Sequence, residues 1–179
     1  MANPMYGQNK ADNLLDGIAD NQAILDETVV KSSKAITITA AANSDGTVAQ
    51  PAGTTLMSVI LSAQSVITTA GGSGDDLDFS MGTAAGGAQI LAAKAILDDG
   101  GAAVSLAAGA AYEVISGGLG QAANAFVGLG TATSEASPVV GALYSAAARD
   151  VHFRFTPLAN NLAVTGTVDV ICTFVKTNA

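Results

Sequence analysis

The stretch Val-His-Phe-Arg-Phe at residues 151–155 decides the fold class of this chain. Its first, third and fifth side chains are apolar, and the two between them are polar. Successive side chains of a β-strand point to opposite faces, so this alternation predicts a strand with one buried face. Residues 168–175, Val-Asp-Val-Ile-Cys-Thr-Phe-Val, carry apolar residues on both faces, which predicts a strand that is central in a sheet or covered.

Further strand patterns recur outward from these two stretches, about every 10 to 15 residues, with glycine, aspartate and asparagine between them. Tight turns are predicted at Asn-Ser-Asp-Gly (residues 43–46) and Pro-Ala-Gly (residues 51–53). The remaining predicted strands cover residues 36–40, 56–69, 77–81, 89–97 and 112–116.

One of these strands, residues 56–69, has a face that we assign to Met57, Val59, Leu61 and Ala63. Another, residues 89–97, is rich in alanine, which favours a helix, but it is short and bounded by glycine pairs. We therefore interpret residues 89–97 as a strand.

The arrangement of these elements predicts a mainly β fold. A βαβ architecture would need amphipathic helices between the strands, and no convincing one follows Lys34. Short strands with turn residues between them are typical of an antiparallel β-sandwich or a jelly-roll-like domain, which we assign to residues 31–179. A length of 179 residues fits one such domain with an arm.

Residues 1–30 differ from the rest and hold five of the fifteen acidic residues. Leu14, Leu15, Ile18 and Leu25 fall near helical spacing. We interpret this segment as an N-terminal arm with at most a short amphipathic helix; the alternative is a frayed terminus. Because the arm cannot bury a core of its own, these four side chains are the candidate partner-binding residues.

Charge and composition narrow the function. Seven basic residues against fifteen acidic ones give a net charge of −8, which weighs against nucleic-acid binding and against adhesion to anionic lipid. Only 12% of the residues are charged, so small residues must form much of the surface, or other subunits must cover it. Neither a signal-peptide pattern nor an apolar stretch near 18 residues is present, so we expect no membrane association.

The chain offers little for catalysis, and we expect no enzymatic activity and no cofactor. His152 is the single histidine and is predicted to lie on the polar face of a strand, where a surface or interface role is the usual one. Cys172 is the single cysteine and is predicted to be a buried structural thiol. The Gly-x-Ser-x-Gly nucleophile motif is absent from the sequence.

Two weaker motifs point to ligands and are better explained otherwise. Residues 118–123 match Gly-x-Gly-x-x-Ala, but no βαβ unit surrounds them, so nucleotide binding is not expected. Aspartates gather at residues 75–78 and at 98–99. Calcium could use them, but their spacing matches no EF-hand, and we interpret them as solvated turn residues with no metal bound.

Three stretches carry a resemblance to a known family. They are Ala-Asn-Pro-Met-Tyr-Gly-Gln-Asn-Lys-Ala-Asp-Asn (residues 2–13), Asp-Phe-Ser-Met-Gly-Thr-Ala (residues 78–84) followed by a glycine pair, and Asn-Leu-Ala-Val-Thr-Gly-Thr-Val (residues 161–168). Together with the acidic arm and the Ala/Gly/Thr-rich β domain, the chain resembles head decoration (cement) proteins of tailed bacteriophages, especially those of marine phages.

The resemblance implies a structural virion protein that coats the outside of an icosahedral shell and stabilises it. It implies the major capsid protein as partner, a homotrimer with an arm over neighbouring subunits, and production in the host cytoplasm. It has no catalytic residues to carry over. Two other classes stay open: a tail-fibre or receptor-binding module, and a carbohydrate-binding or enzymatic β-sandwich. The last is disfavoured by three tyrosines and no tryptophan, because sugar sites stack on aromatic rings.

Overall fold

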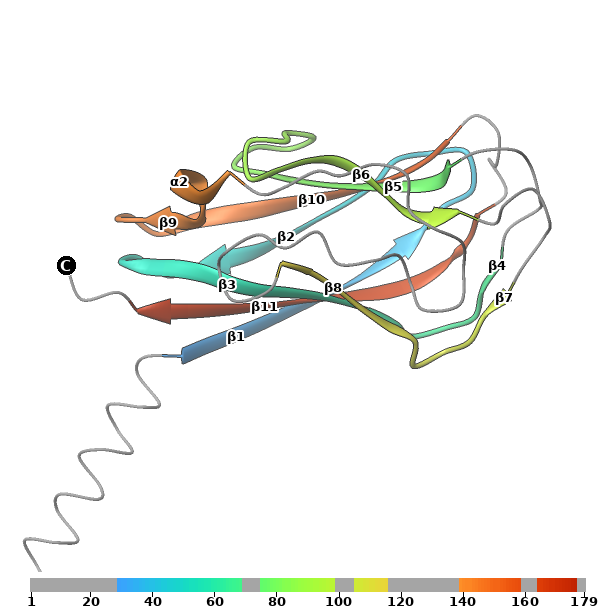
Figure 1. Ribbon diagram of the computed structural model, residues 1–179, viewed down its shortest axis with the longest axis horizontal. Helices are drawn as coiled ribbons and strands as arrows, with labels where there is room; N and C mark the ends of the chain where they lie inside the picture. Colours follow the sequence, from blue (N-terminus) through green and yellow to red (C-terminus); the bar gives the residue numbers. More distant parts are fainter. Residues whose placement is uncertain (1–28, 69–74, 99–104, 116–138, 159–163, 177–179) are drawn as a thin grey trace, which may run out of the picture.

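The computed structural model describes residues 29–68, 75–98, 105–115, 139–158 and 164–176, which form two packed antiparallel sheets (Figure 1). Sheet A has the order β1 (Val29–Ile38), β11 (Gly166–Lys176), β3 (Thr54–Ala63) and β8 (Ala111–Ile115), with β9 (Tyr144–Ser145) also beside β3. Sheet B has the order β2 (Ser44–Gln50), β10 (Arg149–Pro157), β5 (Asp75–Gly82) and β6 (Leu91–Asp98). The predicted mainly β sandwich is therefore confirmed.

Two small elements complete the described chain. β4 (Ile67–Thr68) pairs with β7 (Ser105–Leu106) at one end of the sandwich. The four-residue helix α2 (Val140–Leu143) lies at the other end, next to β9 and β3 (Figure 1). No helix of the described residues is long and apolar enough to span a bilayer.

The pairing of the longer strands follows a simple rule. Among the described residues, eight strands have five or more residues, and the first of them pairs with the last, β1 with β11. The second pairs with the seventh (β2 with β10), the third with the sixth (β3 with β8), and the fourth with the fifth (β5 with β6). The first half of the chain thus runs antiparallel to the second half as a ribbon of paired strands. Successive strand pairs along this ribbon alternate between sheet A and sheet B.

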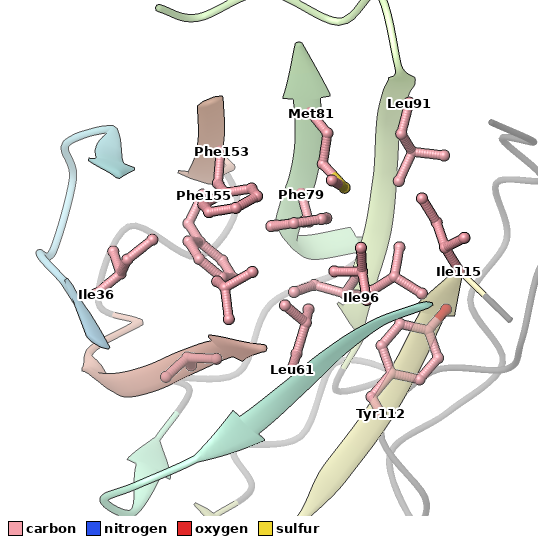
Figure 2. Packing of buried hydrophobic residues seen from close by; sticks show 14 of the residues in the cluster. Ile36, Leu61, Phe79, Met81, Leu91, Ile96, Tyr112, Ile115, Phe153 and Phe155 are labelled. Carbon is pink, nitrogen blue, oxygen red and sulfur yellow. The ribbon is translucent and has the colours of Figure 1, made fainter. Parts of the chain in front are cut away.

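The two stretches that begin the sequence analysis become the second strand of each sheet, β10 and β11. Val151, Phe153 and Phe155 of β10 are at most 1% exposed, and β11 lies between β1 and β3, as predicted for a strand that is apolar on both faces. Phe155 stands directly opposite Phe79 of β5, and their ring centroids are 5.0 Å apart. In Figure 2 these rings lie across from Leu61 of sheet A.

The predicted strand over residues 56–69 is wrong in its length and at Met57, whereas Val59, Leu61 and Ala63 share a buried face as predicted. β3 ends at Ala63, and Ile67 begins a separate strand in another sheet. Along β11, Phe174 pairs with Leu56 and Thr173 with Ser58, so Met57 is an extra residue in a β-bulge. The bulge reverses the alternation, with the result that Leu56 is buried and Met57 is not.

The turn predicted at residues 43–46 is also misplaced. Ser44 already begins β2, and the chain reverses just before it, where Ala41 has a φ of 58°. Gly46 lies within the strand, and a Cβ there would approach the Ile36 Cδ1 atom to 2.6 Å. This glycine therefore leaves room for the Ile36 side chain of β1 and does not form a turn.

The N-terminal boundary falls slightly earlier than the sequence indicates. Val29 and Val30, assigned to the arm, already pair with Val175 and Phe174 in sheet A. The candidate partner-binding residues Leu14, Leu15, Ile18 and Leu25 lie outside the described residues, so their assignment stays a prediction.

Truncating an aromatic side chain of the core tests this packing. Phe153→Ala should lower the free energy of unfolding by about 3 to 5 kcal/mol, because it removes a fully buried ring. His152→Ala, one residue away on the opposite face, should cost less than about 1 kcal/mol. Urea denaturation followed by circular dichroism measures both, and equal losses would contradict the assigned faces.

Candidate functional site

The outer face of sheet A is the candidate interaction face, and strand register defines its rows. Val29 pairs with Val175, Val175 with Thr55, and Thr55 with Tyr144. Residues directly opposite each other in a ladder share a face. Their chain neighbours Phe174 and Leu56 point into the core, so these four residues point outward. We call them the outer strip; it crosses four strands, about 14 Å at the usual strand spacing.

Further rows of the same face carry small side chains and few charges. Thr173 and Ser58 form the next row with Lys31, and the Ser58 hydroxyl donates to a Glu113 carboxylate oxygen at 3.0 Å. Beyond that row, Ile171 and Ile60 stand opposite each other, both half-buried. The face is thus mainly apolar or small, which suits close contact with another protein surface.

The outer face of sheet B carries an ion pair within the fold. Arg154 of β10 stands opposite Asp45 of β2, and its Nε and Nη2 atoms each donate to the carboxylate at 2.8 Å. This hydrogen-bonded pair holds the pKa of the Asp45 carboxyl below its ordinary value. His152, the lone histidine, lies one pair away on the same face, between Thr47 and Gly82, and is half-buried.

A buried polar network ties the end of the sandwich together. The Gln50 amide is fully buried and donates to the carbonyl oxygens of Thr54 and Leu143, each at 2.9 Å. Its oxygen accepts a hydrogen bond from Arg149 Nε at 2.8 Å, and Arg149 Nη2 also donates to the carbonyl of Ala142. The network joins both sheets to α2, so these polar groups hold structure in place and do not face a ligand.

The buried thiol and phenol are poor nucleophiles. Cys172 is fully buried on the inner face of β11, as predicted, and burial raises the pKa of its thiol to about 12. Burial likewise raises the pKa of Tyr112 to about 12. The buried Lys94 ammonium lies 5.7 Å from the Tyr112 ring centroid, a cation–π contact between the two sheets.

The predicted ligand motifs do not assemble within the described residues. There, no group of three or more histidine, cysteine, aspartate or glutamate side chains is placed to hold a metal. The backbones of Asp75 and Asp98 pair at one end of β5 and β6, whereas residue 99 and residues 118–123 lie outside the described chain.

The residues of the outer strip were not recognised from the sequence as interaction residues. Val29 and Tyr144, exposed by 42% and 41%, are distant in the sequence and share one face only through β11 and β3, which lie between them. A signal for Val175 was present, because apolar residues occupy both faces of the last strand. That pattern did not indicate which protein surface covers the outer apolar residues of this strand.

Comparison with known proteins gives little. No protein-family model matches the chain, and no curated protein matches it. One solved structure, that of infectious bursal disease virus, Gx strain, is similar over 82% of this chain and 34% of its own chain, at 10% identity and a TM-score of 0.17. A likeness at this level carries no argument about function.

Removing the Gln50 amide should loosen the end of the sandwich. Gln50→Ala leaves the carbonyls of Thr54 and Leu143 without this donor in a buried site, and we expect a loss of about 2 to 4 kcal/mol in unfolding free energy. Hydrogen exchange of residues 139–145 should quicken more than that of β5. Ala49→Ser, at the exposed neighbouring position, should change neither measurement, and a similar effect from it would contradict the network.

Stability should fall at alkaline pH. In the folded chain the Cys172 thiol and the Tyr112 phenol stay protonated up to about pH 12, whereas their ordinary pKa values are 9.0 and 10.0. Above pH 9 the unfolded chain therefore binds fewer protons than the folded one, and stability decreases as pH rises from 9 toward 12. Urea midpoints at pH 8, 9.5 and 11 measure this decrease. Cys172→Ala should flatten its first part, and an unchanged slope in that variant would refute the assignment.

Proposed function

We propose that this protein is a structural virion protein, a capsid decoration (cement) protein that binds the outside of a tailed-bacteriophage head and stabilises it. The observation that carries the proposal is the order of strand pairing. The pairs β1–β11 and β3–β8 belong to sheet A, and the pairs β2–β10 and β5–β6 belong to sheet B, so that successive pairs alternate between the two sheets. We infer that this winding is a jelly roll, the arrangement that viral capsid domains share with lectins and cupins.

Composition and charge favour the capsid class among these. The chain has no tryptophan and three tyrosines, which is a poor supply of rings for sugar stacking. Its pronounced polar contacts, Arg154 with Asp45 and Arg149 with Gln50, are directed at other groups of the same fold. What the described chain does present outward is the mainly apolar face of sheet A, a surface suited to protein contacts.

The proposal includes partners. The major capsid protein is the expected shell partner, and a homotrimer the expected assembly. The arm, residues 1–30, would hold a subunit to its neighbours through Leu14, Leu15, Ile18 and Leu25. Burying one such side chain contributes roughly 1.5 to 3 kcal/mol before ordering costs, so several together suffice to fix an arm.

Locating the protein on virus particles tests the proposal. Gold-labelled antibodies raised against the purified chain should decorate the heads of particles of the virus whose genome encodes it, in many copies per head. The purified chain should also co-sediment with heads and not with host cells. Antibody absorbed beforehand with the purified chain serves as the control and should remove the label.

Two results would overturn this function. Label confined to the tail tip, together with binding to host cells, would identify the alternative, a tail-fibre or receptor-binding module. Purified particles without any copy of the chain would exclude a virion role altogether.

A further inference from the structure

The outer strip has the features of a contact surface that is open in a single chain. Among the described residues, four large apolar side chains are exposed, Val29, Val66, Val139 and Tyr144, and two of these four end the strip. Val175 and Thr55, between them, are half-buried, so three of the four residues of the strip are apolar. Single exposed apolar residues are ordinary, but a row across four strands marks a site for a partner.

The charged residues near the strip are two lysines, Lys31 and Lys176, and one glutamate, Glu113, which is hydrogen-bonded to Ser58 in the adjacent row. Lys31 stands in the adjacent row of the outer face, and Lys176 follows Val175 at the end of β11. Both side chains are exposed. Of the other basic residues in the described sheets, Arg154 pairs with Asp45, Arg149 with Gln50, and Lys94 lies within the core. Lys34 is exposed on β1, on the opposite face of that strand from Lys31. A partner with apolar and acidic residues would therefore match this corner.

The N-terminal segment has that composition. Residues 1–28 hold five acidic residues and one basic residue, together with the apolar Leu14, Leu15, Ile18 and Leu25. The segment joins the described chain at Val29, the first residue of the strip. The N-terminal segment therefore offers acidic and apolar side chains, and it is attached at one end of the strip.

We propose that the outer strip is the docking site for the N-terminal segment, residues 1–28, of a second copy of this chain. A second copy is favoured because Val29 enters β1 along the strand direction, whereas the strip runs across the strands, so docking Leu25 on its own strip would leave only residues 26–28 for the chain to turn back. Passing each segment to the next copy makes a head-to-tail contact, which forms a ring when the rotation between copies closes. The inference rests on the proposed function for its oligomer and names the surface that would hold the copies together.

Disulfide trapping in the full chain tests the site. Gln22→Cys lies between Ile18 and Leu25 and leaves the four apolar residues in place, and Thr55→Cys lies in the middle of the strip. With both in a Cys172→Ala background, mild oxidation should link copies into covalent oligomers on a non-reducing gel. Gln22→Cys with Val66→Cys is the matched control, because Val66 is exposed by 53% at a position outside the strip, and it should link at least tenfold less.

A second measurement uses the unlinked chain. Light scattering coupled to size exclusion should give the full chain a mass near three times 17.6 kDa. Tyr144→Asp should reduce this to a single chain, while Val66→Asp should not. Raising salt from 0.05 to 0.5 M should lower the cross-linking yield, because Lys31 and Lys176 attract an acidic segment.

The outcomes separate clearly. A cross-linked species that stays a single chain would overturn the exchange between copies, and equal linking at residues 55 and 66 would overturn the strip as the site. A Tyr144→Asp variant that keeps the oligomer would do the same. These experiments use no virus particles, so a negative result would overturn the docking site and leave the proposed virion function standing. Conversely, an absence of label on virus heads would overturn the virion function and leave the docking site standing.

Discussion

The burial of aromatic rings from sheet B against the aliphatic side chains of sheet A is the interaction on which the rest of this structure depends. Phe79, Phe153 and Phe155 are at most 1% exposed, and the Phe79 ring centroid lies 6.3 Å from that of Phe153 and 5.0 Å from that of Phe155. Each sheet has one face that is stable only against the other. The chain therefore contributes strands to both sheets and passes repeatedly between them. In the paired ribbon it does so while every long strand stays antiparallel to its neighbours.

That packing leaves the two outer faces to serve other purposes. On sheet B, Arg154 and Asp45 pair with each other across neighbouring strands. On sheet A the outer strip leaves Val29 and Tyr144 exposed beside two lysines, and the chain joins its acidic N-terminal segment at the same place. The asymmetry gives the proposed assembly a direction, with one face for contacts between proteins.

Much of the fold could be predicted because a period of two is a local property. The strand at residues 151–155 shows it without interruption, and its buried face is as predicted. In residues 168–175, which are apolar on both faces, Val168, Val170, Cys172 and Phe174 form the buried face. Prediction failed where a neighbouring strand overrides local pattern. The bulge at Met57 exists because β3 must stay in register with β11, and Gly46 is set by the Ile36 side chain beside it, so neither could be inferred from its own stretch.

The candidate site divides in the same way. By itself, the sequence determined that the chain is mainly β, that the strand around His152 has a polar face, that Cys172 is a core residue, and that acids and apolar side chains gather in residues 1–28. Tertiary structure decided which residues meet: Val29 and Tyr144 enter one row only because β11 and β3 lie between their strands. The reason is physical, since alternation along a strand reports burial, whereas register across a sheet depends on partners distant in the chain.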